Sequence, residues 1–153
     1  MNNYRNLMIL ILLVMVLVAS GCNSEGASQD SDKTTPSNAK VEKIEIIHFH
    51  GTNQCTSCIT VGAYAEETVN TYFADELKSG KIVFAHINGE LPENREKVIL
   101  YGATGSSLWI GVYDDTGFHA EQNTNVWYKT GDKEGYKTYL KGVIDKRLAG
   151  DMS

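Results

Sequence analysis

Two cysteines three residues apart, Cys55 and Cys58, stand where a strand pattern gives way to a helix pattern. The residues before them, Ile44 to Phe49, form an apolar, β-branched run that ends near Gly51 and predicts a buried strand. The residues after them repeat apolar side chains at helical spacing. Because the first thiol would meet the free amides and the dipole of a helix N-terminus, this junction predicts a reactive cysteine pair that can close into a disulfide.

The rest of the chain continues this alternation of strands and helices. The helical repeat after Cys55 ends at Ser79-Gly80, and a turn at Asp114 to Gly117 predicts an antiparallel hairpin. The remaining segments are predicted as a strand at Lys81 to Ile87, a helix at Pro92 to Leu100 closed by Gly102, strands at Ser107 to Tyr113 and Phe118 to Glu121, and a final helix from Tyr136 to Leu148. The predicted order is βαβαββα.

This order, with Cys55-Thr56-Ser57-Cys58 between the first strand and the first helix, resembles the thioredoxin fold. The resemblance implies an α/β domain with a central mixed sheet flanked by helices. The stretch from His50 to Cys58, followed by Tyr72 to Leu77, is similar to a small thioredoxin-like family labelled as a nitrophenyl-compound nitroreductase subunit. No Gly-rich turn between a strand and a helix is present to hold a flavin or a nicotinamide, so our expectations rest on the fold and not on that label.

The resemblance implies a role for each cysteine. Cys55 is the attacking thiol, which forms a mixed disulfide with a partner, and Cys58 is the resolving thiol. Thr56 and Ser57 lie between them, where a hydroxyl or a backbone amide can donate to the Cys55 thiolate and lower its pKa. The implied activity is thiol–disulfide exchange with protein thiols and disulfides, with no cofactor beyond the redox-active disulfide.

Two departures from the thioredoxin pattern concern the residues around the cysteines. Such oxidoreductases usually carry a cis-proline just before the third strand of this order, where this chain reads Gly105-Ser106-Ser107-Leu108. A non-proline cis bond costs about 3–4 kcal/mol, so we expect a trans loop at Ser106 and Ser107 and atypical substrate docking. His48 stands near the position where many thioredoxins bury an acid that assists proton transfer, and a histidine can do the same.

Two other classes of function remain open. Cys55 and Cys58 with His48 and His50 provide four ligands that copper or zinc could accept, which is typical of a metal-binding or metal-delivery module. Alternatively, the domain is a non-catalytic interaction module with a structural disulfide, although so short a loop restrains the unfolded chain little. The other two histidines, His86 and His119, are expected to pack or face water, and Glu66-Glu67 is expected to form a solvated helix face.

The first part of the chain has the pattern of an export signal. Leu7 to Val18 are apolar without exception, but a bilayer-spanning helix needs about 20 such residues. The sequence Ala19-Ser20-Gly21-Cys22 follows and resembles the lipobox of prokaryotic lipoproteins, in which the cysteine is lipidated and becomes the new N-terminus. We therefore predict a signal peptide with a lipobox at residues 1–21 and acylation of Cys22. A plain signal peptide and an uncleaved anchor are the alternatives.

Composition separates a tether from the folded domain. Residues 22–40 are almost entirely polar and cannot bury enough surface to offset their ordering entropy, so they are predicted to be a flexible tether. Residues 41–150 are then the thioredoxin-like domain. The 14 Lys and Arg against 19 Asp and Glu exclude a basic surface for nucleic acid. The expected location is the extracytoplasmic side of the cell membrane, where the domain is lipid-anchored and has envelope proteins as partners.

Overall fold

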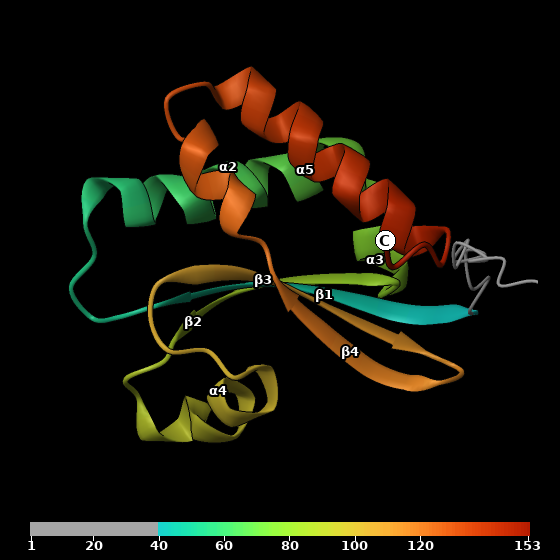
Figure 1. The fold of residues 1–153 in the computed structure, drawn as a ribbon, viewed down its shortest axis with the longest axis horizontal. Coiled ribbons are helices and arrows are strands. Elements are labelled where there is room, and N and C mark those ends of the chain that lie inside the picture. The colour runs from blue at the N-terminus through green and yellow to red at the C-terminus, as the bar shows by residue number, and fades with distance from the viewer. Residues whose placement is uncertain (1–39) are drawn as a thin grey trace, which may run out of the picture. The chain divides into compact units, whose positions relative to one another are not determined.

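The computed structural model describes residues 40–153, and Figure 1 shows their arrangement. The predicted signal peptide, Cys22 and nearly all of the predicted tether lie outside the described residues. Within residues 40–153, no helix is both long and apolar enough to cross a membrane.

Four strands form one mixed sheet. The spatial order is β2-β1-β3-β4, with β1 parallel to β2 and antiparallel to β3, and with β3 antiparallel to β4. The predicted terminal hairpin is therefore confirmed. The strands are β1 (Val41–His50), β2 (Ile82–Asn88), β3 (Ser107–Asp114) and β4 (Gly117–Gln122).

Helices cover both faces of this sheet. Figure 1 shows α2 and α5 on one face and α4 on the other. The helices are α2 (Thr56–Tyr72), α3 (Ala74–Ser79), α4 (Arg95–Tyr101) and α5 (Lys133–Leu148), with short 3₁₀ segments η1 (Pro92–Asn94) and η2 (Thr124–Lys129). The predicted mixed α/β class, a four-stranded mixed sheet flanked by helices, is confirmed.

The single helix predicted from Cys55 to Ser79 is wrong, because it is two helices. The backbone of Phe73 leaves helical geometry, with φ −132° and ψ 34°, and separates α2 from α3. The Phe73 side chain is buried in the main core, so packing overrides the continuous helical repeat. The segment η2 was not predicted, because its one buried residue, Val126, gives no helical repeat.

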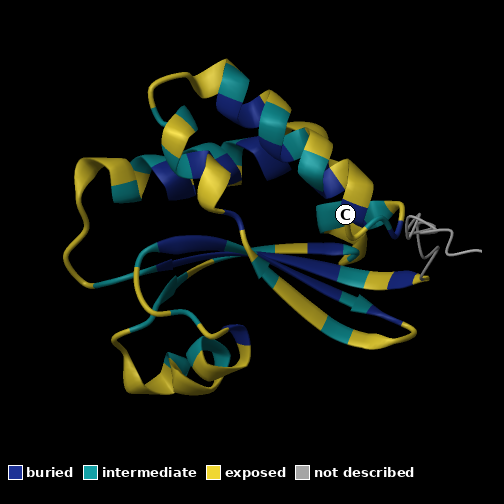
Figure 2. Ribbon diagram, viewed as in Figure 1, coloured by how far each residue is buried: buried dark blue, intermediate teal, exposed yellow. Residues whose placement is uncertain are grey.

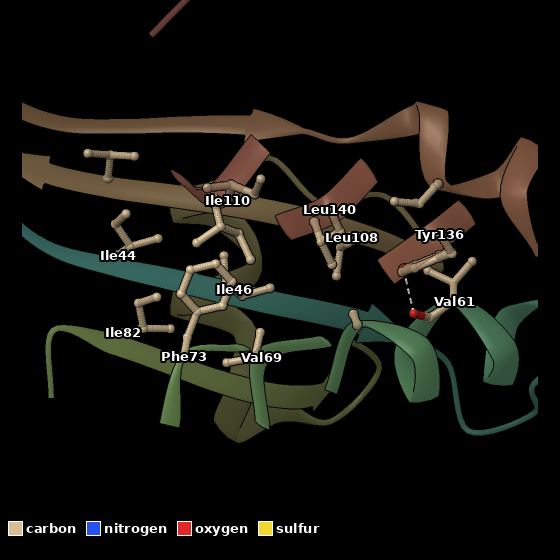
Figure 3. Close-up of a cluster of buried hydrophobic side chains, with 14 of the residues drawn as sticks. Ile44, Ile46, Val61, Val69, Phe73, Ile82, Leu108, Ile110, Tyr136 and Leu140 are labelled. Carbon is tan, nitrogen blue, oxygen red and sulfur yellow. Dashed lines mark hydrogen bonds between the residues drawn. The ribbon is translucent and has the colours of Figure 1, made fainter. Parts of the chain in front are cut away.

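The main core lies between the sheet and the pair α2 and α5. Figure 3 shows these side chains, and Figure 2 shows that the buried positions follow the inner faces of the elements. Tyr136 of α5 donates from its hydroxyl to the Val61 carbonyl of α2 at 2.7 Å, which ties the two helices together. On β1, Ile44 and Ile46 enter this core, and strand alternation places His48 on the same face.

A second, smaller core lies on the other face of the sheet. Ile47 and Phe49 of β1 pack there with Tyr101 of α4 and with Trp109 of β3. Because alternate residues of a strand face opposite sides, Glu45 points to this second face. β1 is therefore buried on both faces, and it carries one buried ionisable residue on each, Glu45 and His48.

Candidate functional site

The cysteine pair lies at the start of α2, directly after β1 and its loop. Cys55 and Cys58 form a disulfide, with Cα atoms 5.0 Å apart. Cys55 is the N-cap of α2, and its Sγ accepts a hydrogen bond from the backbone N–H of Cys58 at 3.1 Å. The Cys55 residue is exposed and Cys58 is half-buried. An amide and a helix dipole aimed at the Cys55 sulfur also stabilise a thiolate there.

Thr56 and Ser57 are both exposed. In the disulfide form, the amide that donates to Cys55 Sγ belongs to Cys58, and the Thr56 carbonyl accepts from the Thr60 hydroxyl at 2.9 Å. The hydrogen bond expected from Thr56 or Ser57 is thus made by the next residue along, because the N-cap side chain reaches the amide three positions later.

Ser107 is the first residue of β3 and pairs with Phe49 at the end of β1, and Ser106 immediately precedes the strand. All peptide bonds of residues 40–153 are trans. The Ser107 hydroxyl donates to the Gly105 carbonyl and accepts from the Trp109 indole N–H, both at 2.9 Å, so it organises the start of the strand. The Ser106 hydroxyl is buried and has no hydrogen-bond partner among the described residues.

A pocket of about 240 Å³ connects this loop with the loop before the cysteines. His50 and Gly51 line it on one side and Thr104 and Gly105 on the other. A larger pocket, of about 540 Å³, lies elsewhere, between β4, η2 and α5, and neither cysteine lines it. The cysteines do not line the smaller pocket either, but its lining includes His50 and Gly51, which precede them in the chain, and Gly105, which precedes Ser106.

His48 lies in the main core under the first turns of α2. The residue is 1% exposed, and a Cβ added at Gly62 would overlap its ring. His48 Nδ1 lies 2.9 Å from His86 Nδ1, and His48 Nε2 is buried with no hydrogen-bond partner among the described residues. Burial, together with the neighbouring His86 and His50, lowers the pKa of His48 to about 4, and the backbone of Cys58 acts in the opposite direction. His48 is therefore neutral at physiological pH.

Two residues that the sequence analysis assigned to packing or solvent contact belong to the same cluster. His86 lies directly opposite His48 in the parallel pairing of β1 and β2. Its other ring nitrogen, Nε2, lies 3.3 Å from Glu66 Oε2 on α2. The predicted strands Ile44 to Phe49 and Lys81 to Ile87 bring the two histidines together only when they pair in parallel in this register. Neither strand determines that register from its own sequence.

The four ligands of the metal alternative are not assembled as a set. Cys55 and Cys58 are joined to each other, and His50 Nδ1 lies 2.9 Å from the Gly51 carbonyl. The rings of His48 and His50 are stacked, with centroids 5.5 Å apart. Over residues 40–153, no three His, Cys, Asp or Glu side chains are placed so that they could hold a metal ion.

No family model, curated protein or solved structure matches this chain. The cysteine pair at disulfide distance and the small α/β sheet fit a thioredoxin-like fold. A cysteine pair in the disulfide form at a helix N-terminus is also compatible with redox activity.

Proposed function

We propose that residues 41–150 form a thioredoxin-like domain that exchanges electrons with protein thiols and disulfides through Cys55 and Cys58. The observation that carries this proposal is the position of Cys55, an exposed N-cap whose sulfur accepts the Cys58 amide while it is bonded to the half-buried Cys58. A purely structural bridge closing so short a loop gives the folded state little advantage. A redox role accounts for both the exposure and the helix terminus.

In the reducing direction, the exchange has two steps. The Cys55 thiolate attacks a partner disulfide, forms a mixed disulfide and releases one partner thiolate, which takes a proton from water. Cys58 then loses its proton and attacks Cys55 Sγ, so the Cys55–Cys58 bond forms and the second partner thiolate leaves. The partner is reduced by two electrons and the cysteine pair is oxidised. The oxidising direction is the reverse.

His48 has the supporting role in this proposal. It lies under the half-buried side of the pair, and it is neutral because burial lowers its pKa to about 4. Because the lowered pKa disfavours a charged ring, His48 can take the proton that Cys58 loses in the second step only while it gives up the proton on its other nitrogen. The small pocket between His50 and Gly105 is the place where the partner chain beside its reacting sulfur would dock.

The two cysteines should differ in reactivity, and this tests the proposal. In the reduced protein, iodoacetamide at neutral pH should modify Cys55 well before Cys58. Cys58→Ser should accumulate a mixed disulfide with a partner, because the resolving thiol is gone, whereas Cys55→Ser should accumulate none. Faster alkylation of Cys58, or unchanged exchange with a model disulfide in both variants, would mean that the bridge is structural.

The proposed setting is the cell envelope, with the domain held on the extracytoplasmic side of the membrane through acylated Cys22. The support is the short apolar segment and the small residues that lead into Cys22. Mass spectrometry of the mature protein should find an N-terminal acylated Cys22, and Cys22→Ala should leave the precursor unprocessed or release the domain. A mature protein that begins elsewhere without acyl mass contradicts the anchor but leaves the redox proposal intact.

A further inference from the structure

The contact with the Glu66 carboxylate favours one tautomer of His86 and, through it, one tautomer of His48. An ionised carboxylate can only accept, so His86 Nε2, 3.3 Å from Glu66 Oε2, carries the proton. In a neutral imidazole the other nitrogen is then an acceptor. His86 Nδ1 therefore accepts, and His48 Nδ1 donates across the 2.9 Å between them. By the same rule, His48 Nε2 is left as a bare acceptor.

That bare acceptor lies at the buried end of the cluster. His48 Nε2 has no partner among the described residues, in a core where buried polar atoms are normally paired. The His48 ring packs against Gly62, and Cys58 lies on the same face of α2 one turn earlier. The backbone of Cys58 favours the protonated form of this ring. The effect of the Cys58 backbone on this ring places His48 beside the resolving cysteine, and its buried Nε2 has no hydrogen-bond partner among the described residues.

The opposite end of the cluster reaches solvent. The side chains of His86 and Glu66 are 38% and 51% exposed. The other groups around these rings are His50, stacked on His48 from β1, and Phe84, which meets the His86 ring edge-on from β2. From a buried base to an exposed carboxylate, the three side chains form an unbroken series of hydrogen bonds between β1, β2 and α2.

We infer that His48, His86 and Glu66 form a proton path that carries the Cys58 proton to solvent during the second step of exchange. The inference rests on the proposed redox function. The Cys58 thiol gives its proton to His48 Nε2, His48 Nδ1–H passes its proton to His86 Nδ1, and His86 Nε2–H passes its proton to Glu66 or water. The Cys58 thiolate then bonds to Cys55 Sγ, and the partner thiolate leaves and is protonated by water. His86 and Glu66 act through His48 and are positioning residues.

The tautomers can be tested without any redox activity. In the oxidised protein at pH 7, ¹⁵N NMR should show His48 protonated at Nδ1 and His86 protonated at Nε2. Glu66→Gln should populate the other His86 tautomer, because an amide can donate as well as accept. The matched control is Glu67→Gln, since Glu67 pairs with Lys133 and Lys137 instead. A His48 ring protonated at Nε2 overturns the path, whatever the cysteines do.

The kinetic test separates the two steps. When reduced protein reacts with 5,5′-dithiobis(2-nitrobenzoate), the first thiolate released reports attack by Cys55 and the second reports attack by Cys58. His86→Gln should slow the second release about tenfold at pH 7 relative to the first, because the path out of His48 is cut. His119→Gln, a change at an exposed histidine of β4, should not. Equal rates of the second release in His86→Gln and wild type overturn the path, whereas absence of the first release in wild type overturns the redox proposal itself.

Discussion

Two ionisable side chains are buried on β1, three residues apart and on opposite faces of the sheet, and they differ in their hydrogen bonding. Glu45 accepts hydrogen bonds from Lys43 at 2.8 Å, Lys97 at 2.5 Å and the Tyr101 hydroxyl at 2.8 Å. His48 has one hydrogen-bonded nitrogen and one unpaired nitrogen. Glu45 is fully satisfied, whereas His48 keeps a free acceptor.

The pKa values express this difference. Burial alone would raise the pKa of Glu45, but the donors around it lower the pKa to about 2, so the charge is the stabilised form. Burial lowers the pKa of His48 to about 4 with little to oppose it, so the charge is the disfavoured form. Glu45 keeps its charge because donors surround it, whereas the buried His48 ring, with one unpaired nitrogen, resists becoming charged.

Replacement of Glu45 should give the largest effect on stability. Glu45→Gln removes a buried charge and leaves Lys97 and Tyr101 without their carboxylate, which we expect to cost about 3–5 kcal/mol at pH 7. Denaturant unfolding of the oxidised domain measures it, and Glu42→Gln, at an exposed position of the same strand, is the control. Similar losses of unfolding free energy in both variants would mean that Glu45 contributes no more to stability than an exposed glutamate.

The two sites should also lose stability in different pH ranges. Glu45 has a folded pKa of about 2, below its usual 4.5, so its contribution is present above pH 4.5 and is lost as pH falls towards 2. The unfolded chain protonates His48 near pH 6.5 and the folded chain near pH 4, so stability falls over that range as pH is lowered, by roughly 3 kcal/mol. His48→Leu should remove the upper transition and keep the lower one. If His48→Leu still loses stability between pH 6.5 and pH 4, another titrating group causes that loss.

Local patterns in the sequence predicted most of the fold. The apolar run from Ile44 to Phe49, the helical repeat after Cys55 and the turn before Gly117 each depend on neighbouring residues, and each appears in the structure. The break at Phe73 was not predictable in this way. It arises from packing of one ring against distant strands, which a helical repeat does not reveal.

The same distinction between local patterns and distant contacts applies to the candidate site. Spacing and strand position were enough to single out the cysteine pair and His48 as candidates. His86 and Glu66 were not singled out, because they meet His48 only through the pairing of two strands separated by α2 and α3. Glu45 was hidden inside an apolar run, and its partners Lys97 and Tyr101 come from a helix more than fifty residues away. Polar networks built from distant segments leave no local pattern.

A smaller effect tests how closely His48 is packed. Gly62→Ala should cost about 1–3 kcal/mol, because the added Cβ overlaps the His48 ring, even though alanine favours a helix interior by about 1 kcal/mol. In a His48→Ala background the cost should disappear. Gly142→Ala on α5, where a Cβ meets open space, should instead stabilise the domain slightly. Unfolding free energies for this double-mutant cycle decide whether the base is held in place by α2.

The smallest expected effect concerns the outermost donor of Glu45. The Lys43 side chain is 38% exposed, and its removal leaves the hydrogen bonds from Lys97 and Tyr101 in place. Lys43→Met should therefore cost less than about 1 kcal/mol at pH 7, as is usual for an exposed ion pair. Lys97→Met should cost more, because Lys97 is the more buried partner. Denaturant unfolding at low and high salt compares the two variants, and only the Lys43 effect should vanish at high salt. Equal losses of unfolding free energy in Lys43→Met and Lys97→Met would mean that the total positive charge near Glu45 stabilises its carboxylate, whatever the burial of each donor. Glu45 and His48 would then differ in the number of donors around them and not in the burial of those donors.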